Sequence, residues 1–147
     1  HRVSRRQRQM CIRDRNSIKS VTKKEFTESD IMLAKFGTAV ISDVKSNAIL
    51  LVSTTKTGFA TVGVGPGQTS RVEAVRIAAR RAGDRAKGSM MISDAFFPFR
   101  DGIDTANEIG VESIVQPGGS MRDSDSITAA DEHDMSMIFT NRRLFLH

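Results

Sequence analysis

The chain has 147 residues, a length that suits one domain with its own hydrophobic core. Its net charge of +5 originates in residues 1–24, which hold nine Lys and Arg against one acid, whereas residues 25–147 are mildly acidic. The single cysteine, Cys11, excludes a disulfide framework and a cysteine-ligated zinc site in the core, and no apolar run reaches the length of a membrane span. We therefore expect a cytoplasmic protein whose folded domain covers residues 25–147.

Residues 1–24 form a basic arm without hydrophobic periodicity. We interpret this arm as a disordered or artefactual extension and leave it out of the fold prediction. A genuine basic arm would bind phosphate backbones with an affinity that falls as salt rises. The alternative to an enzyme is therefore a non-catalytic module that binds a small molecule, or nucleic acid through this arm.

The hydrophobic pattern of the remaining chain predicts alternating helices and strands. In chain order the predicted elements are helix 27–44, strands 48–53 and 59–64, helix 70–87, strand 90–93, helix 101–109, strand 111–115, helix 123–132 and strand 135–140. A turn containing Gly58 predicts that the first two strands form a hairpin. The later strand–helix alternation predicts parallel strands with helices on both faces. The expected architecture is a three-layer α/β/α domain with a mixed, largely parallel sheet.

Two glycine-rich turns join a predicted strand to a predicted helix. Residues 65–71 read Gly-Pro-Gly-Gln-Thr-Ser-Arg, and residues 116–120 read Gln-Pro-Gly-Gly-Ser. Glycine lets the backbone approach a ligand closely, and a helix N-terminus attracts an anion. Arg71 would add donors for a phosphate or a carboxamide. Taken alone, the first turn is read rather as a tight turn with an arginine that faces solvent, and turns like the second are common.

The segment 93–101, Ser-Asp-Ala-Phe-Phe-Pro-Phe-Arg-Asp, combines aromatic rings with charges. The rings suit a flat ligand, and they can equally fill the core. Asp94 needs a partner such as Arg100 or a ligand N–H group, while Asp101 can also be the N-cap of the next helix. Because parallel strands finish at one end of a sheet, we expect this segment and the two glycine turns to lie together there.

Other candidate groups carry weaker signals. Asn47 offers an amide that can donate and accept, or it forms an Asx turn. Arg142 and Arg143 can bind an anion or remain in water, and His133 is interpreted as a surface residue. From the residues alone we infer a site for a polar, partly flat, anionic small molecule. No nucleophile, base or metal set is present in order, so the residues leave the reaction open.

Six segments resemble the C-terminal part of the bifunctional purine-biosynthesis family that combines AICAR formyltransferase with IMP cyclohydrolase. They keep the family's order and similar spacing: 44–49, 62–71, 93–101, 114–123, 129–133 and 143–147. The resemblance implies a cytidine-deaminase-like fold without zinc and a homodimer, with a monovalent cation in some members. It also implies transfer of a formyl group from the co-substrate 10-formyltetrahydrofolate to the nucleotide AICAR, giving FAICAR, which the family's other domain cyclises to IMP.

The same resemblance implies site residues, carried over position by position. On the AICAR side they are Asn47, Arg71, Phe96 and Arg143. On the folate side they are Val72, Asp101, Ser120 and Met121. Phe96 would offer a flat apolar face to a heterocycle, and Arg71 and Arg143 would supply charge-assisted hydrogen bonds. Asp101 would accept from the N–H groups of a pterin.

The chain also departs from the family pattern. The family's catalytic Lys-His pair lies further upstream, and neither this pair nor the cyclohydrolase domain has a match here. We therefore expect residues 25–147 to be the C-terminal lobe of the formyltransferase domain, with part of the substrate site, no catalytic residue and no activity alone. His147 matches the family's usual last residue, so we expect the missing part to lie on the N-terminal side. We expect neither a membrane nor nucleic acid as a partner.

Overall fold

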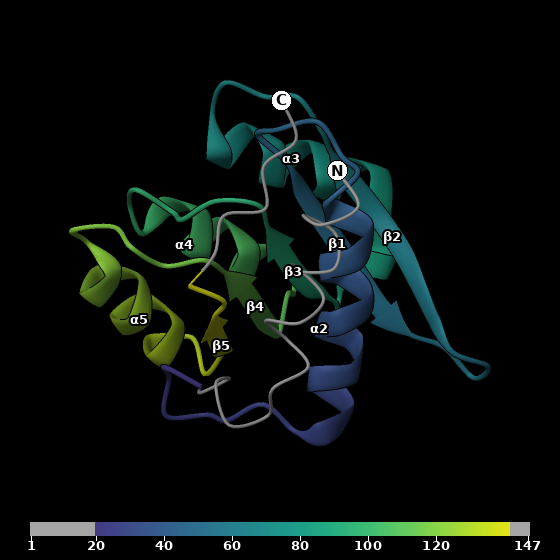
Figure 1. Cartoon of the computed structure of the whole chain (residues 1–147), viewed down its shortest axis with the longest axis horizontal. Helices are drawn as coiled ribbons and strands as arrows, with labels where there is room; N and C mark the ends of the chain where they lie inside the picture. The colour runs from purple at the N-terminus through teal and green to yellow at the C-terminus, as the bar shows by residue number, and fades with distance from the viewer. Residues whose placement is uncertain (1–19, 142–147) are drawn as a thin grey trace.

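The computed structural model describes residues 20–141, which contain four α-helices, a short 3₁₀ helix and a five-stranded sheet (Figure 1). The elements are α2 (Glu28–Ile41), β1 (Ile49–Thr54), β2 (Phe59–Gly65), α3 (Arg71–Ala82), η1 (Gly83–Ala86), β3 (Met90–Ser93), α4 (Asp101–Glu108), β4 (Ser113–Gln116), α5 (Asp123–Glu132) and β5 (Ser136–Phe139). Every predicted element is present, and most ends differ by only a few residues.

The sheet has the strand order β2-β1-β3-β4-β5. β1 pairs antiparallel with both of its neighbours, whereas β3, β4 and β5 are parallel to one another. β1 is therefore the one strand of this sheet that runs against the other four. The prediction of a mixed, largely parallel sheet that begins with a hairpin is confirmed.

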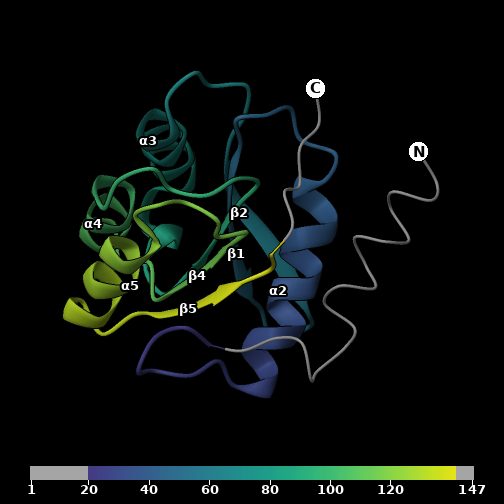
Figure 2. The same cartoon turned by 60° about the vertical axis from the view of Figure 1, so that its left-hand side comes forward.

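Helices cover both faces of the sheet, as Figure 2 shows, with α2 on one side and α3, α4 and α5 on the other. The alternation of side chains along β1 explains the two cores. Leu50 and Val52 pack with α2, while Ile49 and Leu51 pack with the helices of the other face. The three-layer α/β/α architecture is confirmed.

Small residues bring α3 very close to β2. A Cβ atom on Gly63 would collide with the carbonyl oxygen of Ala78, and a Cβ on Gly65 would collide with that of Ala74. The helix contributes its own small buried residues, among them Ala74 and Ala78, to this contact. Since the two backbones touch, the position of α3, including Arg71 at its start, is fixed relative to the sheet.

Two arginines of the α3–η1 region reach the outer side of β2, which is an edge strand. Arg81 donates from Nη1 to the carbonyl oxygen of Val64 at 3.1 Å. Arg85 donates from Nη2 to the carbonyl oxygen of Val62 at 3.5 Å. The β1–β2 register shifts by one residue beside Val62, so one of the two arginines binds next to this irregularity of the edge strand.

The opposite edge of the sheet is contacted by residues from the predicted arm. Ser20 forms an isolated antiparallel bridge with Ile138, and the Val21 amide donates to the Met137 carbonyl at 2.9 Å. The buried Thr22 hydroxyl accepts from the Met137 amide at 2.9 Å. Residues 20–22 of the predicted arm therefore pack against the edge strand β5. The rest of the arm, residues 1–19, lies outside the described residues. The alternative of a nucleic-acid-binding module depends on this arm and stays a prediction.

No helix within residues 20–141 combines the length and the apolar character needed to cross a membrane.

Candidate functional site

Five chain segments meet at one end of the sheet, which we call the loop end. The strands β2, β3, β4 and β5 finish there, and the antiparallel β1 starts there. The register shows this directly, because Ile49 at the start of β1 pairs with both Gly65 and Ser93 at the ends of β2 and β3. The two glycine turns and the aromatic segment 93–101 therefore share one end of the sheet, as predicted from the alternation of strands and helices.

The centre of the loop end is a hydrogen-bonded group that we call the Arg71 cluster: Asn47, Ala48, Arg71 and Asp94. Arg71 donates from Nη1 to the Ala48 carbonyl oxygen at 3.2 Å and to a carboxylate oxygen of Asp94. Its Nη2 donates to Asn47 Oδ1 at 3.0 Å. The Asp94 side chain is fully buried and that of Arg71 is 9% exposed. The partner of Asp94 is thus Arg71, and the expectation that Arg100 could fill this role is wrong.

Backbone hydrogen bonds hold the Asn47 loop against the first glycine turn. The amides of Asn47 and Gln68 exchange bonds with each other's carbonyls at 3.2 and 3.0 Å, and Gly67 donates to the Lys45 carbonyl at 2.7 Å. The Asn47 side chain also donates to the Thr69 carbonyl at 3.4 Å. Its amide therefore both donates and accepts, and the glycine turn is fixed on both sides before α3 begins.

The three phenylalanines of segment 93–101 have different surroundings. Phe97 is buried, its amide donates to Gln116 Oε1 at 3.2 Å, and its ring lies where a Cβ atom on Gly102 would collide with it. Phe99 is 54% exposed, and the Arg122 guanidinium lies 5.2 Å from its ring centroid. Phe96 is half-buried. The core-filling role therefore belongs to Phe97.

A second group of charges, the Arg100 network, follows the aromatic segment and consists of Arg100, Asp104, Glu132 and His133. Arg100 bonds both carboxylate oxygens of Asp104 at 3.0 Å and Glu132 Oε2 at 2.6 Å. His133 Nε2 lies 2.8 Å from Asp104 Oδ1. Hydrogen bonds from Arg100 lower the pKa of Asp104 and of Glu132, and the same bonds raise the pKa of Arg100. Each of these four side chains is at least a quarter exposed to solvent.

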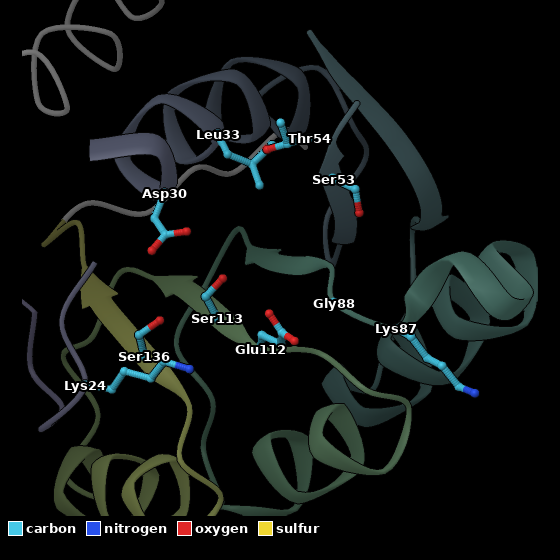
Figure 3. A pocket seen from close by; sticks show the side chains of 10 residues that line it. All are labelled: Lys24, Asp30, Leu33, Ser53, Thr54, Lys87, Gly88, Glu112, Ser113 and Ser136. Atoms are coloured by element: carbon cyan, nitrogen blue, oxygen red, sulfur yellow. The ribbon is translucent and has the colours of Figure 1, made fainter. Parts of the chain in front are cut away.

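A polar cleft of about 340 Å³ opens at the other end of the sheet (Figure 3). Its lining residues are Lys24, Asp30, Leu33, Ser53, Thr54, Lys87, Gly88, Glu112, Ser113 and Ser136. Two of them, Ser113 and Ser136, begin β4 and β5, so this cleft and the Arg71 cluster lie at opposite ends of the strands. None of the predicted site residues within residues 20–141 lines it. Within residues 20–141, no three His, Cys, Asp or Glu side chains gather in a way that could hold a metal ion.

Comparison with known proteins supports the family resemblance seen in the sequence. Residues 4–81 match the family model of the AICARFT/IMPCHase bienzyme. The chain belongs to this family. The bifunctional purine biosynthesis protein PurH of Shouchella clausii (strain KSM-K16) is 46% identical over 134 residues, which cover 91% of this chain and 25% of that protein. The chain thus spans about a quarter of the length of this curated relative and belongs to an enzyme family of purine biosynthesis.

The AICARFT/IMPCHase resemblance assigned four residues to the AICAR side. Asn47 lies in the loop before β1 and Arg71 begins α3, and the two side chains contact each other directly. Phe96 lies two positions after Asp94, in the loop that leaves β3. Arg143 lies outside the described residues. The AICAR-side assignment stays a prediction.

The four residues assigned to the folate side spread over three elements. Val72 is half-buried in the first turn of α3, and Met121, after β4, is fully exposed. The Ser120 hydroxyl accepts from the Arg122 amide at 3.1 Å. Asp101 is the first residue of α4, where it accepts from the Gly102 amide at 2.8 Å, and Arg100 occupies the N-cap position. The alternative role of Asp101 as N-cap is therefore wrong, and the folate-side assignment stays a prediction.

Two residues of the loop end were not singled out as site residues from the sequence. Asp94 was recognised only as a carboxylate in need of a partner. Gln116 is fully buried at the end of β4 and links that strand to the Phe97 amide. The available signal was position: each polar residue directly follows a predicted strand, 90–93 or 111–115, where burial forces a polar group to find a hydrogen-bonding partner.

Proposed function

We propose that this chain carries the nucleotide-binding part of an AICAR formyltransferase site. The observation that carries the proposal is the Arg71 cluster, in which two of the residues expected to contact AICAR are held together at the loop end. Open α/β sheets bind ligands beyond the carboxyl ends of their strands, and the loop end is that region. The cyclohydrolase activity of the family has no comparable support from the motifs of this chain.

The hydrogen bonds of Arg71 support a ligand contact. A guanidinium has five N–H groups, and three of those on Arg71 donate to Ala48, Asp94 and Asn47. Nε–H and one N–H on Nη2 have no acceptor among residues 20–141. These two donors match acceptor atoms of a phosphate or a carboxamide of AICAR.

The aromatic segment supplies the second element of the proposal. Phe97 and the Gln116 side chain fix the backbone of this segment from inside, and Phe96, two positions after Asp94, is half-buried. A partly exposed ring suits stacking on a flat heterocycle such as the imidazole of AICAR. Asp101, Ser120, Met121 and Val72 would then lie on the side of 10-formyltetrahydrofolate, the proposed co-substrate.

The proposal separates binding from chemistry. In formyl transfer the amine nitrogen of AICAR bonds to the formyl carbon, the bond from that carbon to N10 of the folate breaks, and the amine loses a proton while N10 gains one. A weakly nucleophilic amine needs a positioned group to take this proton. The one histidine among residues 20–141, His133, is hydrogen-bonded to Asp104 in the Arg100 network. We therefore propose that proton transfer depends on the family's upstream Lys-His pair and that the full enzyme is a homodimer.

Calorimetric titration of the 147-residue chain with AICAR nucleotide tests the binding part. We expect Arg71→Ala to weaken the affinity at least tenfold, because a charge-assisted contact is worth about 1.5–3 kcal/mol. Arg76→Ala is the matched control, since Arg76 lies on the same helix and makes an exposed ion pair with Glu73. Absence of AICAR binding by the unmodified chain, or equal affinities of the two variants, would contradict the proposal.

An assay of formyl transfer tests the chemical part. The chain alone should show no turnover above the uncatalysed background with AICAR and 10-formyltetrahydrofolate. Addition of the upstream region of a homologous PurH, with its own C-terminal part removed, should restore turnover. Appreciable turnover by the chain alone would show that the upstream Lys-His pair is not required.

A further inference from the structure

Asp94 joins three segments of the loop end through one carboxylate. One oxygen accepts from Arg71 Nη1, and the other accepts from the Ala48 amide at 3.1 Å. The Asp94 amide in turn donates to the Ala48 carbonyl at 3.4 Å, and this carbonyl also accepts from Arg71. The end of β3, the start of β1 and the first residue of α3 are therefore tied together at Asp94.

This arrangement leaves the Arg71 guanidinium little freedom. Acceptors from Asn47, Ala48 and Asp94 surround it on the protein side, and its side chain is only 9% exposed. A free arginine side chain loses about 1.5–2 kcal/mol of conformational entropy when it is ordered. On Arg71 that cost is met during folding, before a ligand arrives, so the two remaining N–H groups are already oriented.

We propose that Asp94 is a positioning residue of the nucleotide site. Its carboxylate holds the plane of the Arg71 guanidinium so that Nε–H and the remaining Nη2–H stay available to acceptor atoms of the ligand. Asp94 itself has both oxygens occupied by protein donors and does not touch the ligand. This inference rests on the proposed function, because it assigns a second residue to the same site.

The first test needs no variant. In nitrogen-15 NMR spectra of the unmodified chain, Arg71 should show separate Nη1 and Nη2 signals and a slowly exchanging Nε–H, which report restricted rotation of the guanidinium. Asp94 accepts from two donors, Arg71 and the Ala48 amide, whereas an asparagine has only one acceptor oxygen. Asp94→Asn should therefore release the Arg71 guanidinium to rotate, and its two Nη signals should merge. A single averaged Arg71 signal in the unmodified chain would overturn the proposal even if no variant folds.

The second test is a double-mutant cycle on the affinity for AICAR nucleotide. Asp94→Asn should weaken binding at least tenfold in the original background and less than twofold in the Arg71→Ala background, because the residue acts through Arg71. A purely structural role predicts equal losses in both backgrounds, and that result would overturn the proposal. Asp104→Asn, which removes the carboxylate from an exposed arginine pair, is the control and should leave the affinity unchanged.

The two proposals fail in different ways. If the unmodified chain binds no AICAR nucleotide, the proposed function is wrong, while the NMR signals still decide whether Asp94 immobilises Arg71. If the chain binds AICAR nucleotide and Asp94→Asn binds it equally well, the proposed function stands and the role of Asp94 is wrong.

Discussion

The aromatic segment 93–101 joins two arginine–carboxylate groups that differ in burial. Near its start, Asp94 is fully buried against Arg71, and at its other end Arg100 pairs with Asp104 and Glu132 in solvent. A buried pair loses much hydration, and leaving one partner alone there is costly, whereas exposed pairs contribute little to stability. The same pairing of arginine with carboxylate thus fixes side-chain positions in the buried group and forms a hydrated surface in the exposed one.

The largest effect is expected from Asp94→Ala. It leaves a buried guanidinium without its carboxylate, with only neutral acceptors, and the Ala48 amide without its acceptor, so we expect a loss of about 3–5 kcal/mol in the free energy of unfolding. Urea unfolding followed by circular dichroism measures this loss. Asp104→Ala, the matched change in the Arg100 network, should cost much less, and equal losses would remove the distinction between the two groups.

Replacing both partners of the buried pair should recover part of this stability. In Arg71→Met with Asp94→Leu, no charge is left uncompensated, and apolar side chains of similar size often replace a buried pair at little cost. The Ala48 amide would still lack an acceptor, so we expect a residual loss of about 1–3 kcal/mol. A double variant as unstable as Asp94→Ala in urea unfolding would show that the charge pair is not the reason for the single variant's loss.

The Arg100 network should be visible mainly in the pH dependence of stability. A hydrogen bond from Arg100 lowers the pKa of Asp104 in the folded state. The ionised Asp104 carboxylate therefore stabilises the fold fully above its pKa in the unfolded chain, which is near 4. This stabilisation is lost as the pH falls through the lower pKa of the folded state. Asp104→Asn should therefore flatten the decline of stability below about pH 4, measured by urea unfolding at several pH values. An unchanged slope would contradict the assignment.

The smallest effect is expected at the exposed contact between Arg122 and Phe99. The guanidinium lies 5.2 Å from the ring centroid, and such contacts at exposed sites contribute about 0.5–1 kcal/mol. Arg122→Gln should lower the thermal midpoint accordingly, while Arg122→Lys should retain part of the contact. A loss comparable to that of Asp94→Ala would mean that exposure does not govern the strength of these arginine contacts.

The fold was largely predictable because its signals are local. Thr27 and Asp30 form a capping box at the start of α2, and the Ser70 hydroxyl accepts from the Glu73 amide at the start of α3. Short apolar runs with regular turns located the strands along the chain, and the alternation with helices predicted that the later strands are parallel. The prediction that the loops meet at one end of the sheet follows from that direction alone.

The partners within the site were less predictable, because they depend on contacts across long stretches of sequence. Arg100 is near Asp94 in sequence, yet the partner is Arg71, 23 positions upstream. That choice depends on the small-residue packing of α3 on β2, which places the start of the helix beside the start of β1. The polar cleft was missed for a similar reason, since its lining residues share no motif and come together only through the sheet.

The arginines that cover the outer side of β2 also bear on how the protein behaves at high concentration. A bare edge strand offers a row of backbone groups to any other extended chain and so promotes intermolecular strand pairing. Arg81 and Arg85 occupy two of those carbonyls from within the same molecule. An incoming strand would have to displace two charged side chains before it could pair, so these arginines oppose aggregation through this edge.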